Sequence, residues 1–69
     1  MKLEKVFYNT AKIMVVVVFN QFFNQYIVFT QNQTDGRKKI LKAFDELQTA
    51  FDYAEKANNK INLVNYLYA

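Results

Sequence analysis

The fold of this chain depends on residues 15–29, which read V-V-V-V-F-N-Q-F-F-N-Q-Y-I-V-F. The stretch allows three structures: a membrane-spanning helix, an amphipathic helix, or two β-strands joined by a short connection. A spanning helix needs about twenty predominantly apolar residues. The most apolar window, residues 11–29, contains a lysine and four primary amides near its middle, and each amide costs on the order of a few kcal/mol to desolvate in lipid. We therefore expect no membrane span.

The remaining choice is between a helix and two strands. In a helix, the amides at positions 20, 21, 24 and 25 would share one face and most aromatic side chains the other, which is the spacing of an amphipathic helix. Propensity favours strands, because β-branched and aromatic residues dominate both ends of the stretch and lose rotamer freedom in a helix. We predict a hairpin with strands at residues 14–20 and 25–31.

A second hairpin is expected further along the chain. Asp35-Gly36 lies between two β-prone runs and is a strong signal for a two-residue type I′ turn, which needs positive φ at both central residues. Such a turn would pair Phe29 with Lys42 on an otherwise apolar face. Either the stem of Lys42 lies along the edge of the core, or the loop is longer than two residues.

A helix is predicted to follow this hairpin. Residues 45–48, D-E-L-Q, form a variant of the capping box with Asp45 as the N-cap. The apolar stripe of the helix continues through Ala50, Ala54 and Ala57, and we expect its end near residues 58–59, because asparagine tolerates the left-handed conformation there. The tail, residues 60–68, fits both a strand and a continued helix, and its β-prone content favours a strand.

Together these elements predict a small α+β domain that spans residues 1–69. A strand at residues 3–8, closed by a turn at Asn9-Thr10, completes an antiparallel β-meander of three to four strands. One helix packs on one face of the sheet, and a C-terminal strand returns to it. The alternative is a two-helix antiparallel hairpin, with helices near residues 4–30 and 38–67.

Several residue types are missing, and their absence excludes most catalytic chemistry. The chain has no His, Cys or Ser, so it lacks the usual general base near neutral pH, the commonest metal ligand and every Ser or Cys triad. The single glycine, Gly36, excludes glycine-rich phosphate loops. We assign the carboxylates to helix capping and to the solvent side of the helix, so we expect no enzyme, no cofactor and no metal site; they are Asp45, Glu46, Asp52 and Glu55.

Four of the nine positively charged residues form the one charge cluster of the sequence. They indicate either a basic hairpin tip that binds nucleic-acid phosphates, with Tyr26 or Phe29 as a stacking partner, or a solvated turn that protects a sheet edge. Acidic residues nearby nearly neutralise the local field, and the net charge is only +3. We therefore favour the solvated turn for this cluster, which consists of Arg37, Lys38, Lys39 and Lys42.

Aromatic residues make up 17% of the chain, more than a core of this size needs, and this surplus predicts a protein partner. We expect Phe22 and Phe23 in the first hairpin, and Tyr66 and Tyr68 near the chain end, to bind it. The leading hypothesis is a non-enzymatic protein-interaction module that acts on an unidentified larger protein. Nucleic-acid binding is the alternative. Abundant Phe, Tyr, Ile, Asn and Lys indicate a low-GC bacterial or phage genome, which suits an accessory protein or inhibitor.

Both faces of the first predicted hairpin are apolar, and one helix covers only one of them. We therefore predict a homodimer that buries Val16 and Val18 against their copies. Glu4 interrupts the positive N-terminal segment and no small-residue cleavage site follows, so no signal peptide is expected. With no cysteine to suggest an oxidising compartment, we expect a cytoplasmic protein.

Overall fold

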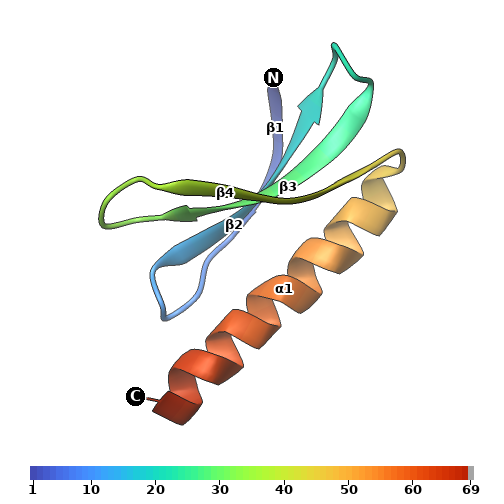
Figure 1. Cartoon of the computed structure of the whole chain (residues 1–69). Coiled ribbons are helices and arrows are strands. Elements are labelled where there is room, and N and C mark those ends of the chain that lie inside the picture. Colours follow the sequence, from blue (N-terminus) through green and yellow to red (C-terminus); the bar gives the residue numbers. More distant parts are fainter. Residues whose placement is uncertain (69) are drawn as a thin grey trace.

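The computed structural model describes the backbone of residues 1–68 and the side chains of residues 1–64. Along the chain, the elements are β1 (Lys2–Phe7), β2 (Ile13–Asn20), β3 (Gln25–Asn32), β4 (Lys38–Phe44) and α1 (Leu47–Tyr68). The strands form one antiparallel, strongly twisted sheet in the order β1-β2-β3-β4, and α1 packs across one of its faces (Figure 1). This is the predicted α+β meander with one packed helix, and the two-helix hairpin is wrong.

The stretch that decides the fold forms two strands. β2 and β3 pair along their whole length, from Asn20 opposite Gln25 to Ile13 opposite Asn32. The four consecutive valines lie in β2, an inner strand, and each is at most 8% exposed. Branched side chains suit the pleated backbone of an inner strand, whose neighbours pack beside it on both faces. Among the residues described, no helix combines the length and the hydropathy needed to cross a bilayer.

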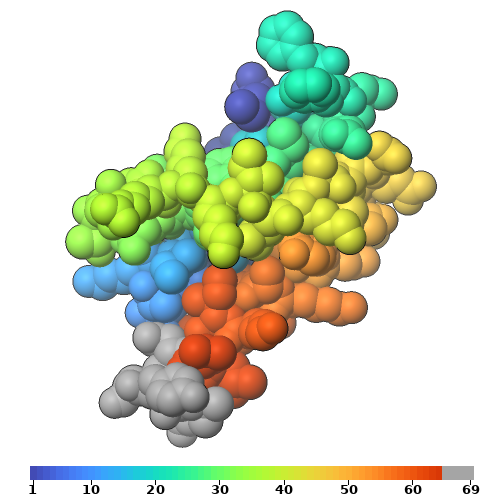
Figure 2. All heavy atoms as spheres, in the orientation of Figure 1, coloured from blue at the N-terminus to red at the C-terminus, as the bar shows by residue number. Residues whose placement is uncertain are grey.

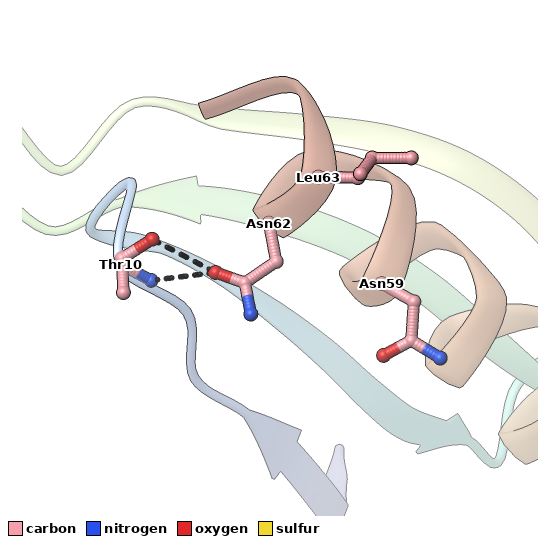
Figure 3. A pocket seen from close by; sticks show the side chains of 4 residues that line it. All are labelled: Thr10, Asn59, Asn62 and Leu63. Carbon is pink, nitrogen blue, oxygen red and sulfur yellow. Dashed lines mark hydrogen bonds between the residues drawn. The ribbon is translucent and has the colours of Figure 1, made fainter. Parts of the chain in front are cut away.

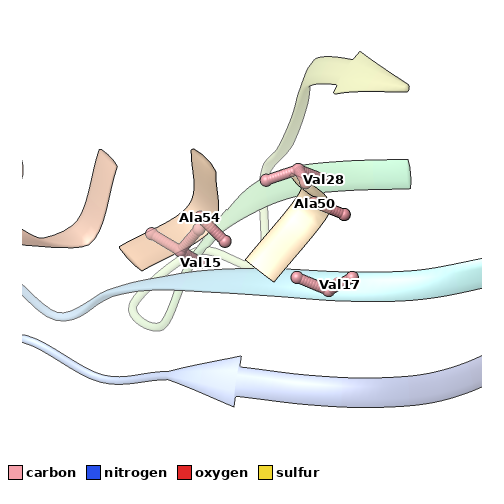
Figure 4. Packing of buried hydrophobic residues seen from close by; sticks show 5 residues of the cluster. All are labelled: Val15, Val17, Val28, Ala50 and Ala54. Carbon is pink, nitrogen blue, oxygen red and sulfur yellow. The ribbon is translucent and has the colours of Figure 1, made fainter. Parts of the chain in front are cut away.

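The core lies between the sheet and α1. Strand alternation turns Val15, Val17 and Val28 toward the helix, where they meet Ala50 and Ala54 (Figure 4). All five side chains are fully buried. Because alanine at positions i and i+4 leaves one helix face nearly flat, the helix backbone lies close to the valines. Larger, partly buried side chains surround this contact: Phe7, Tyr26, Leu41, Phe44, Phe51, Tyr53, Ala57 and Ile61.

The loop between β3 and β4 is longer than the predicted two-residue turn. Asn32 closes it by donating its backbone N–H to the carbonyl of Arg37 at 2.8 Å, and its side-chain oxygen accepts from the N–H groups of Thr34 and Asp35. Only Gly36 has a positive φ in this loop, at 76°. The type I′ turn is therefore wrong, because the asparagine side chain organises a wider loop.

A bulge on β4 also changes the predicted strand register. Phe29 pairs with Ile40 and Val28 with Lys42, so the pairing of Phe29 with Lys42 is wrong. Leu41 is the extra residue, and it packs against the core. The other edge strand, β1, carries a bulge as well. Bulges bend and twist an edge, which makes pairing with another sheet less favourable.

α1 begins later and ends later than predicted. Glu46 holds the N-cap position, because its carbonyl accepts from the N–H of Ala50 at 3.2 Å. The carboxylate of Asp45, the predicted N-cap, instead accepts from the side-chain amide of Gln25 at 3.4 Å. The helix continues to Tyr68, so the predicted end near residues 58–59 and the C-terminal strand are both wrong.

Tertiary hydrogen bonds explain why the helix passes through its asparagines. The Asn58 side chain donates to the carbonyl of Tyr8 at 3.2 Å and accepts from the Asn9 side chain at 2.9 Å. One turn later, the Asn62 oxygen accepts from the hydroxyl of Thr10 at 2.8 Å and from its N–H at 3.2 Å (Figure 3). Asparagine alone is a weak helix former. Here the spacing i, i+4 lets both amides bind the β1–β2 turn.

Ala54→Leu should destabilise the fold, because the added carbons have no space against the buried valines of β2. Overpacking of this kind costs about 1–3 kcal/mol, and 2 kcal/mol lowers the Tm of a domain of this size by about 10 °C. Thermal unfolding followed by circular dichroism measures the change. Glu55→Leu introduces the same side chain at the next, exposed position and should leave the Tm nearly unchanged. Equal losses in the two variants would contradict this packing of α1.

Candidate functional site

The turn between β2 and β3, residues 21–24, exposes two large aromatic side chains. Phe22 is 90% exposed and Phe23 is 72% exposed. In Figure 2 the cyan atoms of this turn project beyond the rest of the molecule at the top of the view. Burying a phenylalanine side chain is worth about 1.5–3 kcal/mol relative to leaving it in water. We call residues 21–24 the aromatic tip.

The backbone of the aromatic tip is fixed by polar contacts. The side chain of Asn20 is only 9% exposed, and its oxygen accepts from the N–H of Phe22 at 2.9 Å and of Phe23 at 3.4 Å. Asn24 ends the turn with a φ of 51°, a left-handed conformation that asparagine tolerates better than most residues. The tip is therefore ordered without a partner, so binding costs little further conformational entropy.

Aromatic contacts support the strands below the tip. The rings of Phe19 and Tyr26, which face each other across β2 and β3, lie 5.0 Å apart at an angle of 52°. Tilted ring pairs at this distance stabilise a strand pair beyond simple burial. The turn that carries Phe22 and Phe23 is thus supported by a fully paired hairpin.

The structure separates the four residues predicted to bind a partner. Phe22 and Phe23 lie together on the aromatic tip, as the sequence suggests. Tyr66 and Tyr68 belong to the last turns of α1 instead of a strand, and their side chains lie outside the part of the chain that the structure describes. Figure 1 shows the aromatic tip and the end of α1 at opposite ends of the molecule. They do not form one site.

The basic cluster is divided by the sheet. Lys38 has its ammonium group 5.6 Å from the centre of the Phe29 ring, on the face away from α1. Lys42 has its ammonium group 5.4 Å from the ring of Phe44, which packs against Tyr53 of α1 on the other face. Residues four apart in a regular strand share a face, but the extra residue Leu41 moves Lys42 to the face opposite Lys38. The cations therefore do not form one continuous basic surface.

The rest of the cluster lies in or beside the β3–β4 loop. Arg37 has its Nε 3.6 Å from a carboxylate oxygen of Asp35, so part of its charge is balanced locally. Lys39 is exposed, and Tyr26, one predicted stacking partner, contacts Phe19 instead. Lysines on an edge strand oppose pairing with another sheet edge, which is the role that this arrangement favours.

A second apolar surface covers the sheet face away from α1, and we call it the open face. It includes Val16 and Val18, but these are only 5% and 8% exposed because the flanking strands cover them. The exposed parts belong to the edge strands, with Leu3 at 60% and Ile40 at 71%. A hollow of about 460 Å³ lies in the open face, lined by Met1, Val18, Ile27, Phe29, Lys38 and Ile40.

Another hollow, of about 350 Å³, lies beside α1 (Figure 3). It is lined by Thr10, Asn59, Asn62 and Leu63. Thr10 and Asn62 bond to each other across it, so these groups serve to dock the helix. Among the described residues, no three His, Cys, Asp or Glu side chains converge on a metal position. Lys38 is the one charged side chain among the residues that line these two hollows.

Sequence reasoning did not identify Asn20, Leu3 or Ile40 as functional residues. Asn20 has a local signal, since asparagine is favoured at the first position of a turn. Leu3 has none, because its place on the open face depends on the bulge in β1. Ile40 lies opposite Phe29, but no local pattern shows that its side chain stays exposed. Comparison with protein-family models, curated proteins and solved structures finds no match to this chain, so its function is argued from these surfaces.

Asn20→Ala should loosen the aromatic tip, because the N–H groups of Phe22 and Phe23 lose their acceptor. A hydrogen bond of this kind contributes about 1 kcal/mol, so the amide exchange of both residues should accelerate by about fivefold. Hydrogen exchange measured by nuclear magnetic resonance tests this. Gln21→Ala, an exposed position in the same turn, is the matched control and should change neither rate. Unchanged exchange in Asn20→Ala would contradict the capping role.

Proposed function

We propose that this chain is a non-enzymatic protein-interaction module, which binds a larger protein by inserting Phe22 and Phe23 into an apolar pocket on that protein. The observation that carries this proposal is the exposure of the two side chains, 90% and 72%, on a turn that Asn20 fixes. Aromatic anchors held in one conformation are typical of residues that dominate binding energy.

The chemistry of the aromatic tip indicates what the partner must offer. Residues 20–25 read N-Q-F-F-N-Q and carry no charge. Amides on both sides of the phenylalanines can donate and accept hydrogen bonds at the rim of a pocket. The matching surface is a hydrophobic pocket with a polar, uncharged rim. Because no ion pair is involved, the affinity should change little between low and physiological salt.

An accessory protein or inhibitor of a phage or mobile element is the biological role that fits this proposal. Such a protein acts by occupying a surface of a host protein, so it needs a stable scaffold and one contact site. The low-GC codon usage inferred from the composition supports this setting. The cytoplasm is the expected compartment, since the chain has no cysteine to suggest an oxidising one.

Nucleic-acid binding through the basic cluster is the second candidate, and one observation favours it. The ammonium group of Lys38 lies 5.6 Å from the centre of the Phe29 ring on the open face. A cation that binds phosphate beside a ring on which a base stacks is the combination that single-stranded nucleic-acid sites use. The other cations support it less, because Lys42 lies on the opposite side of the sheet.

The double variant Phe22→Ala/Phe23→Ala should lose the partner while keeping the fold. Both side chains are mostly exposed, so the Tm should change by only a few degrees. Affinity capture from nuclease-treated lysate of the encoding organism, at physiological salt, measures binding. A protein held in stoichiometric amount by the wild type should fall at least about tenfold with the double variant. Tyr8→Ala, 65% exposed on another part of the surface, is the control and should retain it. Equal capture by both variants would refute the proposal.

The nucleic-acid alternative makes an opposite prediction about salt. If Lys38 and Lys39 contact phosphates, binding of a fluorescent single-stranded oligonucleotide should weaken by about tenfold or more between 50 and 200 mM salt. It should also weaken in Lys38→Ala/Lys39→Ala, which leaves the aromatic tip intact. Lys56→Ala/Lys60→Ala removes the same charge from α1 and serves as the control. Oligonucleotide binding that is equal in both double variants would exclude this candidate.

A further inference from the structure

We propose that a second copy of this chain covers the open face, so that two sheets pack face to face around a two-fold axis with both α1 helices outside. This inference goes beyond the proposed function and involves a different surface from the aromatic tip. It places the main dimer contacts on the exposed side chains of β1 and β4, because Val16 and Val18, the predicted contact residues, are already buried within one copy.

The open face is apolar across all four strands. The apolar side chains on this face are Leu3 and Val6 of β1, Val16 and Val18 of β2, Ile27 and Phe29 of β3, and Ile40 of β4. Lys38 is the one charged side chain that lines the hollow in this face, and it lies on the first residue of β4. A sheet with one such face in water is unusual, since soluble monomers rarely expose a continuous apolar patch of several hundred Å².

No described part of this chain is free to cover the open face. β1 to β4 and α1 account for the backbone to Tyr68 apart from short loops, and α1 is committed to the other face by its core contacts and its bonds to the β1–β2 turn. A surface that covers the open face needs to be apolar, of similar size and of little charge. A second copy has such a surface.

The size of the open face suits a small dimer. Four strands spaced about 4.8 Å apart, with about 3.4 Å per residue along each, give it plan dimensions of about 19 by 20 Å. The two plan areas together are about 760 Å², and the relief of the side chains raises the accessible surface buried toward about 1,000 Å², the size of a weak, reversible interface. Two sheets of equal twist also fit one another, since sheets that pack face to face align at about −30°.

The edge strands of the sheet oppose pairing with another sheet, which leaves the open face for association. β1 and β4 are bulged, and β4 carries Lys38, Lys39 and Lys42, all of which oppose edge-to-edge pairing. With the edges blocked and one face under the helix, the open face remains. A face-to-face contact closes after two copies, so the assembly stops at a dimer.

Light scattering and sedimentation at about 50 µM test the stoichiometry, and the wild type should show twice the mass of the chain. Ile40→Lys should raise the dimer dissociation constant by about a hundredfold and give a folded monomer, because Ile40 is 71% exposed within one copy and its loss does not disturb the core. Leu63→Lys is the matched control, since Leu63 is 58% exposed on α1. This variant should remain a dimer.

Nuclear Overhauser contacts between labelled and unlabelled copies give a second readout. They should join methyl groups of Leu3, Ile27 or Ile40 in different copies. A wild type that is monomeric at 50 µM, equal dissociation in the Ile40 and Leu63 variants, or intermolecular contacts on α1 would overturn the inference. The Phe22→Ala/Phe23→Ala variant should stay dimeric, so loss of partner capture and loss of the dimer are separate results.

Discussion

The contact between two alanines and three valines determines the rest of this structure. Ala50 and Ala54 let α1 approach the sheet until Val15, Val17 and Val28 are fully buried. The contact is small, so larger side chains around its rim supply much of the burial that a chain of 69 residues needs. Because this packing uses one helix face and one sheet face, the exposed apolar side chains on the other face of the sheet are left for a surface role.

Local sequence preferences predicted the strands and the approximate start of the helix. Valine propensity and the amides of residues 20–25 fixed the first hairpin to within one residue, because β-branched side chains and turn residues act over short distances. The end of α1 was missed for the opposite reason. Asn58 belongs to the predicted helix end and Asn62 to the predicted C-terminal strand, yet both bind the β1–β2 turn about fifty residues earlier, and no local pattern reveals such a contact.

The candidate site also combines a feature that the local sequence predicts with one that depends on other parts of the fold. Phe22 and Phe23 could be identified because two phenylalanines among amides are conspicuous in a turn. Whether they face water depended on Asn20, whose side chain fixes the turn. The open face was harder to predict, because the extra residue Leu41 in β4 shifts the register, so that Ile40 lies opposite Phe29 on this face while Lys42 and Phe44 lie on the helix side. One bulge thus decides which side chains a second molecule would meet.

The bonds between α1 and the β1–β2 turn also govern the order in which the chain folds. They join residues 49 to 52 positions apart, whereas the meander is built from hairpins between neighbours. Contacts at short separation form sooner, since less loop entropy is lost on closing them. On the ribosome, the sheet emerges before the helix, so both of its apolar faces meet water until the last third of the chain is synthesised. Docking of α1 is therefore the late step of folding, and the nascent sheet is most prone to aggregation before it occurs.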